Sequence, residues 1–500
     1  KMLNISTIAI LLLLGVMSIS FLGSEFTPTL QEGSLVIKLT APPSTALEQT
    51  KKITQLVEKR VMKIHEVKEI LSRVGRGEVG AHADPVNNAE MYIILKPKNQ
   101  WKNIKTQEDL EEAVREKLEG FPGVLFNITQ PIEMTVDELL EGVQADLAIK
   151  VFGDDLDSLK LNADKIAELI KKVQGARDVQ VGQISGSPQL VIEPNRKQIA
   201  RYGINLAEVQ ELIKTAIGGE TVAQLYEGIK RFDIYVRFDE ADRKDPEAIS
   251  RLLVTAPNGV RVPLGQIANI KEIIGPRQIT RENNQRFITI QANVRDRDIG
   301  SFVEEASARL DKEIKLPSGY FVTWGGQFRL QQEANKRLMI VVPLALALVF
   351  LLLYMNFNSI KNSLLILINI PLALIGGLLA LLISGQNLSV PSSIGFIALF
   401  GIALENGLVL ISYLEQLIQE GLELNKAVIK AALLRLRPVL MTALTTGLGL
   451  IPLLVSTGVG SEVQKPLATV VIGGLVSSTV LTLLVLPSLY KWFHEKKEGN

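Results

Sequence analysis

The sequence predicts an α+β membrane protein: a six-helix transmembrane bundle joined to a large polar region with a repeated strand and helix order. Three observations predict it. Hydrophobic residues make up 47% of the 500 residues and mean hydropathy is +0.22, which is high for a soluble protein. The apolar residues are concentrated at the two ends of the chain. The region between them alternates strand and helix patterns, and the order occurs twice.

Composition also excludes several function classes. Without cysteine, the chain has neither disulfides nor a thiolate metal site, and its three histidines, His65, His82 and His494, are too few for an imidazole cluster. The net charge is +1 and basic residues form no stripe, which argues against nucleic acid as a partner. A Walker-type loop is also absent from the sequence, so ATP is not the energy source.

The first apolar segment, Met2 to Leu22, predicts a transmembrane helix within residues 1–23. It follows Lys1 and is longer than the hydrophobic region of a typical secretory signal. No A-x-A cleavage site follows it, because Gly-Ser-Glu-Phe leads directly into a structured pattern. We therefore expect a retained helix rather than a removed leader.

The region after this helix predicts two ferredoxin-like βαββαβ units. The first unit is expected over 24–145, and the second over 146–188 and 276–330. For the first unit the strands are SLVIKLT, EMYIILKP and GVLFNIT, and the helices are Leu47 to Met62 and Leu110 to Leu118. For the second unit the strands are ADLAIKVFG, ARDVQVG, QRFITIQANV and YFVTWGG, and the helices are Leu159 to Val173 and Phe302 to Ile314.

An insert interrupts the second unit over 189–275. It contains a strand followed by two helices separated at Tyr202-Gly203, and Asn205 is a suitable N-cap for the second of them. RFDIYVRF and VRVPLGQIANI predict further strands, while Ser185 to Gln189 is expected to form a turn. Two interpretations of the insert stay open: a surface for contact with another chain, or a purely structural element.

The C-terminal part, 331–492, predicts five further transmembrane helices, followed by a cytoplasmic tail over 493–500. The five are Leu338 to Tyr354, Leu364 to Ser384, Gly395 to Leu414, Leu440 to Val455 and Ala468 to Leu489. An amphipathic interfacial helix is expected at about 417–435, and Arg435 and Arg437 are expected to anchor its end by snorkelling.

The distribution of basic residues predicts the orientation. One set of loops and ends carries Lys1, Lys361, Lys426, Lys430, Arg435, Arg437, Lys491, Lys496 and Lys497. The opposite short loops, SGQNLS and STGVGSEVQK, hold only Lys465. By the positive-inside rule both termini are cytoplasmic and the polar region lies outside the inner membrane.

The span Gly395 to Leu414 carries Glu405 and Asn406 near its middle. A charged carboxylate at the centre of a bilayer costs from ~2.5 kcal/mol to much more, so such residues usually face a protein interior or a water-filled path. Two interpretations follow. Glu405 acts in an ion or proton path, or it is protonated and only donates a hydrogen bond between helices.

Several segments together resemble the heavy-metal efflux branch of the resistance-nodulation-division (RND) superfamily, of the cobalt/zinc/cadmium type. They are GSEFTPTLQEGSLVIKL, ADLAIKVFGDD, GFIALFGIALENGLVL, LRLRPVLMTALTTGLGLIPLLVSTGVGSEVQKPLATVVIGGL and LTLLVLPSLY. The resemblance implies the carboxy-terminal half of a proton-antiporting pump rather than an enzyme. It further implies a homotrimer with an amino-terminal half, a membrane-fusion adaptor and an outer-membrane channel, with the insert as the docking surface.

The resemblance also assigns roles to residues. Glu405 and Asn406 belong to a proton relay, to which Thr445, with Thr442 and Thr446, contributes more weakly. Lys38, Glu138 and Thr221 stand where copper and silver pumps have methionines, and Met134 is the only methionine nearby. The expected cargo is therefore a divalent ion such as Zn²⁺, Co²⁺, Cd²⁺ or Ni²⁺, with Zn²⁺ first, and no permanently bound cofactor is expected.

The expected ligands for this cargo are Asp84, Asp137 and Glu141, and less strongly Glu138 and His82. Asp137 and Glu141 are spaced i, i+4, so a helix would place both on one face. The alternative is that these acids only solvate a loop and a helix. At the level of the whole chain, three alternatives stay open: a non-transporting structural or regulatory partner, copper or silver efflux, and a related RND protein for lipids or protein secretion.

Overall fold

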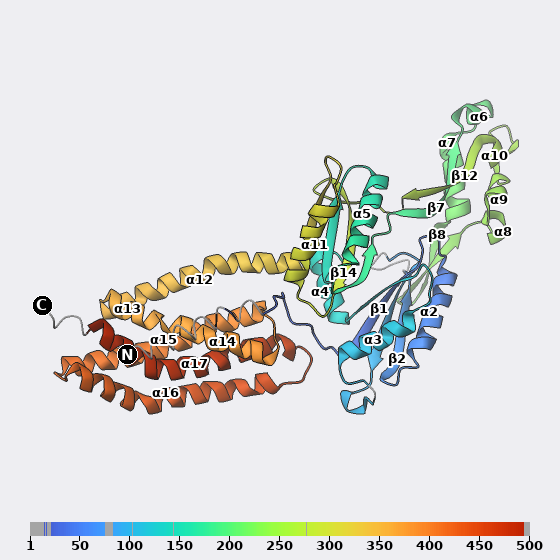
Figure 1. Ribbon diagram of the computed structural model, residues 1–500. Helices are drawn as coiled ribbons and strands as arrows, with labels where there is room; N and C mark the ends of the chain where they lie inside the picture. The colour runs from blue at the N-terminus through green and yellow to red at the C-terminus, as the bar shows by residue number, and fades with distance from the viewer. Residues whose placement is uncertain are drawn as a thin grey trace. The chain divides into compact units, whose positions relative to one another are not determined.

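The structure of the protein is a computed structural model that describes residues 15, 17, 22–75, 84–102, 104–143, 145–276 and 278–494 (Figure 1). The predicted first span, Met2 to Leu22, therefore lies almost entirely outside the described residues. The chain forms two compact units. One is Gln183–Ile279, and the other comprises Lys1–Gly182 with Thr280–Asn500.

The first part of the larger unit follows the element order strand, helix, two strands, helix, strand. The elements are β1 (Ser34–Thr40), α2 (Leu47–Val61), β2 (Val67–Val74), β3 (Asn88–Leu95), η1 (Lys98–Gln100), α3 (Gln107–Leu118) and β4 (Leu125–Thr129). All strand pairs are antiparallel, in the order β2-β3-β1-β4. Alternate residues of β1, such as Leu35 and Ile37, pack with Val57 of α2 and Leu110 of α3 in one core.

A second sheet repeats this arrangement. Its elements are β5 (Leu147–Phe152), α5 (Leu156–Ile170), β6 (Ala176–Val181), β13 (Thr280–Glu282), β14 (Gln285–Val294), α11 (Ile299–Glu313) and β15 (Phe321–Gly326). The strand order is β13-β14-β5-β15, with β6 also paired to β14. Phe302 of α11 and Leu159 and Ile166 of α5 are fully buried. The strands and helices predicted for both copies are confirmed, whereas the strands β2 and β13 were missed.

The two sheets are joined by a polar contact. The Arg115 guanidinium of α3 binds both carboxylate oxygens of Asp178 on β6, with Nη2 3.2 Å from Oδ2. Asn293 Nδ2 donates to the same Oδ2 at 3.1 Å and to Asn127 Oδ1 at 2.6 Å. Because the side chain of Asp178 is only 4% exposed, this contact is largely shielded from water.

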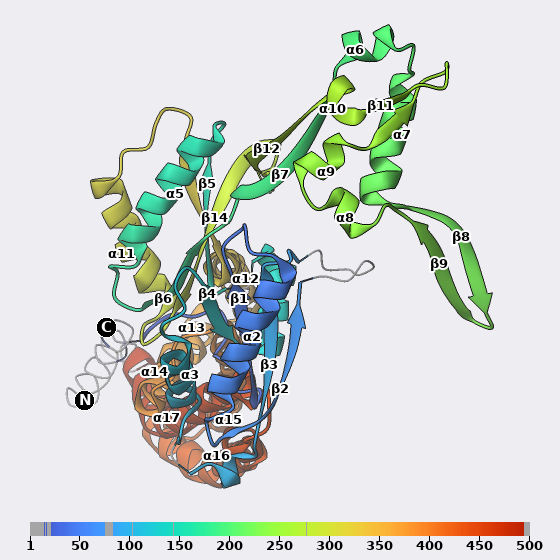
Figure 2. The same cartoon turned by 90° about the vertical axis from the view of Figure 1, so that its right-hand side faces the viewer.

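The unit Gln183–Ile279 holds the insert. Its elements are β7 (Ser185–Pro194), α6 (Arg196–Arg201), α7 (Leu206–Ile213), the π-helix η2 (Lys214–Gly218), β8 (Glu220–Glu227), β9 (Lys230–Val236), α8 (Glu240–Arg243), α9 (Pro246–Ser250), β10 (Leu253–Thr255), β11 (Arg261–Pro263), α10 (Leu264–Ile267) and β12 (Ala268–Pro276). The Asn205 cap is confirmed, since its side chain accepts from the Ala207 amide at 3.0 Å. Figure 2 shows the β8–β9 hairpin extending from the rest of this unit.

The turn predicted at Ser185 to Gln189 is wrong. These residues begin β7, which pairs antiparallel with β12 along its length. Ser, Gly and Pro favour turns locally, but a distant strand satisfies their backbone groups here, and this long-range pairing outweighs the local preference. Gly186 keeps a positive φ of 93°, which glycine adopts at no steric cost.

Five helices among the described residues are long and apolar enough to cross a membrane, and they overlap the five predicted C-terminal spans. The helices are α12 (Gln327–Phe357), α13 (Ile360–Leu367), α14 (Asn369–Ser384), α15 (Val390–Gln419), α16 (Leu424–Val455) and α17 (Ser461–His494), with α13 and α14 together forming one span. Helix α17 packs against α14, α15 and α16. Glycines make the α14–α17 contact close, because a Cβ on Gly473 would meet the Gly376 carbonyl oxygen at 2.6 Å.

The separate interfacial helix predicted at about 417–435 is wrong. Helix α15 continues to Gln419, Gly421 (φ +90°) turns the chain, and α16 then runs without a break from Leu424 through Pro438. A helix of 32 residues is about 48 Å long, whereas the hydrocarbon layer is about 30 Å thick, so its first turns can project beyond the apolar part. Arg435 lies over the Tyr413 ring at 4.7 Å, which ties α16 to α15 near this boundary.

Candidate functional site

Helix α4 (Pro131–Glu141) carries the central acids of the candidate site. Proline at its first position supplies a suitable φ where no intrahelical hydrogen bond is needed. The Glu32 carboxylate accepts from the amides of Ile132 at 2.7 Å and Glu133 at 3.0 Å, so it caps the helix from a distant position in the chain. Gly142, in the left-handed conformation, ends the helix.

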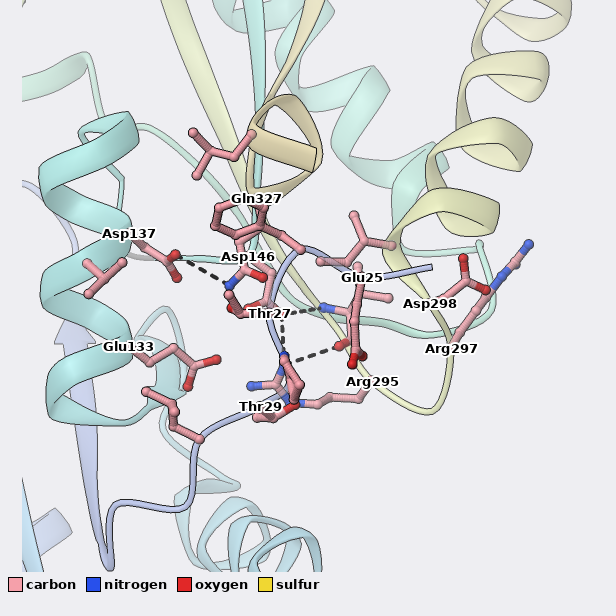
Figure 3. Close-up of a pocket in the computed structure, with 17 residues that line it drawn as sticks. Glu25, Thr27, Thr29, Glu133, Asp137, Asp146, Arg295, Arg297, Asp298 and Gln327 are labelled. Carbon is pink, nitrogen blue, oxygen red and sulfur yellow. Dashed lines mark hydrogen bonds and ion pairs between the residues drawn. The ribbon is translucent and has the colours of Figure 1, made fainter. Parts of the chain in front are cut away.

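Glu133 and Asp137 lie one turn apart on α4 and face the same cavity (Figure 3). Asp137 is 6% exposed and accepts a hydrogen bond from Gln327 Nε2 at 3.4 Å. Glu133 Oε2 accepts from Gln130 Nε2 at 3.3 Å and Thr129 Oγ1 at 3.4 Å. These bonds fix the direction of both carboxylates but leave each with further acceptor capacity.

Asp146 and Arg295 form the opposite wall of the cavity. Arg295 Nη1 lies 2.7 Å from Asp146 Oδ2, which also accepts from the Val294 amide at 3.0 Å. Arg295 Nε lies 3.6 Å from Glu111 Oε2 on α3. One guanidinium is therefore surrounded by several carboxylates, and the cluster holds more negative than positive charge.

Burial, together with this surplus of negative charge, raises the pKa values of the α4 acids. Burial, followed by the charges of Asp146 and Glu133, raises the pKa of Asp137 to about 8. Burial and the charge of Asp146 raise the pKa of Glu133 to about 7. For Arg295, burial lowers the pKa, but the carboxylates of Asp146, Glu133 and Glu111 raise it by more, so the net shift is upward. Near neutral pH the cluster therefore holds exchangeable protons.

The cavity has a volume of about 140 Å³. Besides the acids it is lined by Glu25 to Leu30, by Arg297 and Asp298 before α11, and by Gln327 at the start of α12. Since a water molecule takes about 30 Å³ in the liquid, the space suits a few waters or a partly hydrated small cation. An arrangement of acceptor oxygens with titratable protons can exchange protons for a cation.

The structure brings only part of the predicted ligand set to this cavity. Asp137 lines it, whereas Asp84 does not and lies 3.9 Å from Arg73 Nη2. Glu138 follows Asp137 on α4 and is half-buried. His82 and the side chain of Glu141 lie outside the described residues. Among the described residues, no group of three or more His, Asp or Glu side chains is already arranged around a metal position.

Glu133, Asp146, Glu111 and Arg295 were missed by the sequence analysis. Glu133 could have been found, because it lies four residues before Asp137 on the same predicted helix. The other three come from α3 and from the ends of two strands, and only the packing of the two sheets brings them together. No local pattern in the sequence marks them as neighbours.

The intramembrane residues occupy a different part of the bundle. Glu405 of α15 is exposed and makes no hydrogen bond or ion pair with the described residues, while Asn406 is 6% exposed. Within the described part of the chain, Asn406 Nδ2 has no hydrogen-bond partner. Thr445 and Thr442 donate to carbonyls of their own helix, those of Met441 at 2.7 Å and Val439 at 3.0 Å. These bonds satisfy the two hydroxyls locally and do not connect them to Glu405.

The chain is similar in sequence to a family of known proteins. The AcrB/AcrD/AcrF family matches residues 1–494. The chain is 45% identical to the cobalt-zinc-cadmium resistance protein CzcA of Cupriavidus metallidurans over 484 residues, covering 95% of this chain and 46% of that protein. It is 43% identical to the nickel and cobalt resistance protein CnrA of the same organism, covering 97% and 45%.

A more distant relative and a protein of solved structure are both efflux proteins. The cation efflux system protein CusA of Escherichia coli is 33% identical, with 95% of this chain and 46% of that protein covered. An X-ray crystal structure of a heavy metal efflux pump superposes with a TM-score of 0.89 at 39% identity, covering 99% of this chain and 50% of that chain. The chain thus spans about half the length of the relatives it matches.

Proposed function

The chain belongs to the AcrB/AcrD/AcrF family of RND transporters and to its heavy-metal efflux group, and from this premise we propose that it exports divalent metal cations in exchange for protons. The proposed cargo is of the Zn²⁺, Co²⁺, Cd²⁺ and Ni²⁺ class, with Zn²⁺ first. CzcA and CnrA are named for resistance to such ions, and carboxylate oxygens suit them.

One observation carries the proton-coupled part of the proposal. Glu405 lies in the middle of an apolar helix of 30 residues, on a face that the described helices of this chain leave exposed. An exposed carboxylate in hydrocarbon is too costly to serve packing alone. A second polypeptide, a part of this chain outside the described residues, or a water-filled path must therefore meet it, and Asn406 beside it is expected to orient it.

Because Glu405 needs a partner that the described helices do not supply, we propose that the chain is the carboxy-terminal half of a longer pump. We propose that Met2 to Leu22 completes a bundle of six spans, and that the two sheets are ferredoxin-like units with the element order βαββαβ. The apolar windows of α12 and α16 are only 6% buried, against 50% in the other spans. These two helices are thus open to lipid or to an amino-terminal half.

The larger assembly follows from the same proposal. We place the sheets and the insert, 189–275, in the periplasm, and both termini in the cytoplasm of a bacterium whose inner membrane holds the bundle. A homotrimer with a membrane-fusion adaptor and an outer-membrane channel completes the export path. The insert is the proposed docking surface.

The cation path is proposed to include Asp137, with Glu133 and Asp146 near it, and Asp84, Glu138, Glu141 and His82 as further ligands in other states. Binding of a cation at Asp137 is expected to release protons, because the pKa values of Asp137 and Glu133 are raised. A copper or silver pump is less well supported, since Met134 is 5% exposed in the α4 packing and has no methionine partner in the cavity lining.

Proteoliposomes test the proposal. They contain the chain alone or with a candidate amino-terminal half, and proton flux is measured on addition of Zn²⁺ or Cu⁺. We expect Zn²⁺-driven flux that Glu405→Gln abolishes and that Glu420→Gln, a control in the loop directly after α15, leaves intact. Flux that persists undiminished in Glu405→Gln would contradict the relay. Absence of flux from folded, inserted chains in both preparations would favour a non-transporting partner.

A further inference from the structure

A ten-residue segment, Gly23–Glu32, lies between the first predicted span and β1, and we call it the strap. Its first end is bonded to the loop before α15. The Leu388 amide donates to the Gly23 carbonyl at 2.8 Å, and the Glu25 amide donates to the Leu388 carbonyl at 3.0 Å. The Val390 amide donates to the Phe26 carbonyl at 3.1 Å. Leu388 and Val390 flank Ser389, the N-cap of α15.

Side chains reinforce this end. Asn387 Nδ2 donates to Glu25 Oε2 at 2.9 Å, and Gln331 of α12 donates to Ser24 Oγ. The approach is close, because a Cβ on Gly23 would meet Asn387 Oδ1 at 2.7 Å. The start of the helix that carries Glu405 is thus attached to the strap by several hydrogen bonds.

The other end of the strap is attached to α4. Glu32 accepts from the two amides at the start of α4, as described above. The fully buried Gln130 donates to the Leu30 carbonyl at 2.5 Å, and its Oε1 accepts from the Glu32 amide at 2.9 Å. The start of the helix that carries Glu133 and Asp137 is therefore fixed to the same short segment.

The middle of the strap closes one wall of the acid cavity. Glu25 to Leu30 all line it, and Figure 3 shows Glu25, Thr27 and Thr29 on this segment, between α4 and α11. A displacement of either attached end therefore changes the cavity wall as well as the position of the other end. The strap contains neither a helix nor a long strand that could absorb such a displacement by internal sliding.

We propose that the strap couples the position of α15 to that of α4, and that Glu32 and Asn387 are positioning residues for transport that never touch the cargo. The inference rests on the proposed function for its direction: a change of state at Glu405 moves the start of α15, and the strap passes this movement to the acids of α4. Movement of α4 on cation binding passes in the opposite direction.

The first test needs no transport. Asn387→Ala removes one attachment at the α15 end, and hydrogen exchange of α4 amides is measured in the intact chain. We expect exchange over Pro131–Glu141 to rise at least threefold, although no hydrogen bond or ion pair joins Asn387 to α4 among the described residues. Ser384→Ala is the matched control, because its hydroxyl donates to the Leu381 carbonyl of its own helix. Unchanged exchange in α4 would overturn the inference whatever the chain transports.

The second test separates binding from transport. For Asn387→Ala and Glu32→Gln we expect Zn²⁺-driven proton flux to fall at least tenfold, while the Zn²⁺ affinity of Asn387→Ala changes less than threefold. A parallel loss of affinity and flux in Asn387→Ala would show a merely structural role. Full flux in Asn387→Ala, in a preparation where Glu405→Gln is inactive, would refute the strap and leave the proposed function intact.

The absence of cysteine from the chain allows a rescue experiment. Ser24 and Leu388 are bridge partners, so Ser24→Cys with Leu388→Cys places two thiols on adjacent backbone positions. In the Asn387→Ala background, we expect oxidation to restore the flux and the low α4 exchange, and reduction to abolish both again. A cross-linked chain that stays uncoupled would contradict the inference.

Discussion

Replacement of Asp137 by asparagine tests the acid cavity through stability rather than transport. In the folded chain the pKa of Asp137 is about 8, whereas an unperturbed aspartate titrates near 3.8. Between these values the folded state holds a proton that the unfolded chain has lost. The contribution of Asp137 to the free energy of unfolding is therefore fully present at low pH and is lost as the pH rises towards 8.

The magnitude follows from the same two pKa values. One pKa unit corresponds to about 1.36 kcal/mol, and integration from pH 6 to pH 8 gives a loss of about 2 kcal/mol for Asp137. Glu133, with a pKa of about 7, loses about 1 kcal/mol over the same range. Asparagine keeps the shape of the side chain but cannot ionise. In Asp137→Asn, therefore, only the loss of about 1 kcal/mol from Glu133 remains.

The assay is the apparent melting temperature of the metal-free chain in detergent at pH 6, 7 and 8. We expect the melting temperature of the unmodified chain to fall by about 2 °C more than that of Asp137→Asn between pH 6 and pH 8, because the unfolding entropy of a 500-residue chain is about 1 kcal/mol per kelvin. Asp311→Asn, an exposed acid on α11, is the control and should follow the unmodified chain. Parallel pH dependence in the unmodified chain and Asp137→Asn would refute the claim that Asp137 is protonated when the cavity is empty.

Two further predictions concern contacts that hold the larger unit together. Arg115→Ala leaves the Asp178 carboxylate, 4% exposed, without its guanidinium partner and should destabilise the folded chain by about 3 kcal/mol. The double variant Arg115→Ala with Asp178→Asn should recover part of this stability, because the buried charge is then removed. Equal melting temperatures of the single and double variants would argue against a buried ion pair. Gly473→Leu places a side chain against Ala380 and the Gly376 carbonyl and should prevent α14 from packing on α17. Size-exclusion chromatography should show this as a loss of folded chain. Gly458→Leu is the control and should behave like the unmodified chain, because a Cβ at Gly458 meets open space.

Much of the fold could be predicted because its signals are local. The apolar segments that became α12 to α17 are long enough to identify a span without any knowledge of their neighbours. The repeated strand and helix order likewise follows from periodicity within each segment. Strand β2 was missed because Lys68, Glu69 and Arg73 interrupt its alternation, and one of its faces is largely exposed.

The errors have a common cause, which is that tertiary contacts outweighed local preference. The pattern at about 417–435 suggested a helix of its own, yet its residues from Leu424 onward belong to α16, which continues to Val455. Ser185 to Gln189 has turn composition, yet β12 pairs with it. In both cases a local signal was correct as a tendency and the packed structure determined the outcome.

The sequence by itself determined which residues could carry chemistry: a carboxylate in the middle of an apolar span, and acids before and within α4. It also determined the family, through segments that resemble heavy-metal efflux transporters. Only the tertiary structure decided that Asp137 meets Glu133, Asp146 and Arg295 rather than Asp84, and that Glu405 stays exposed among the described helices. The physical reason is that charge interactions depend on distance in space, and Asp146 and Arg295 become neighbours only when β5 and β14 pair.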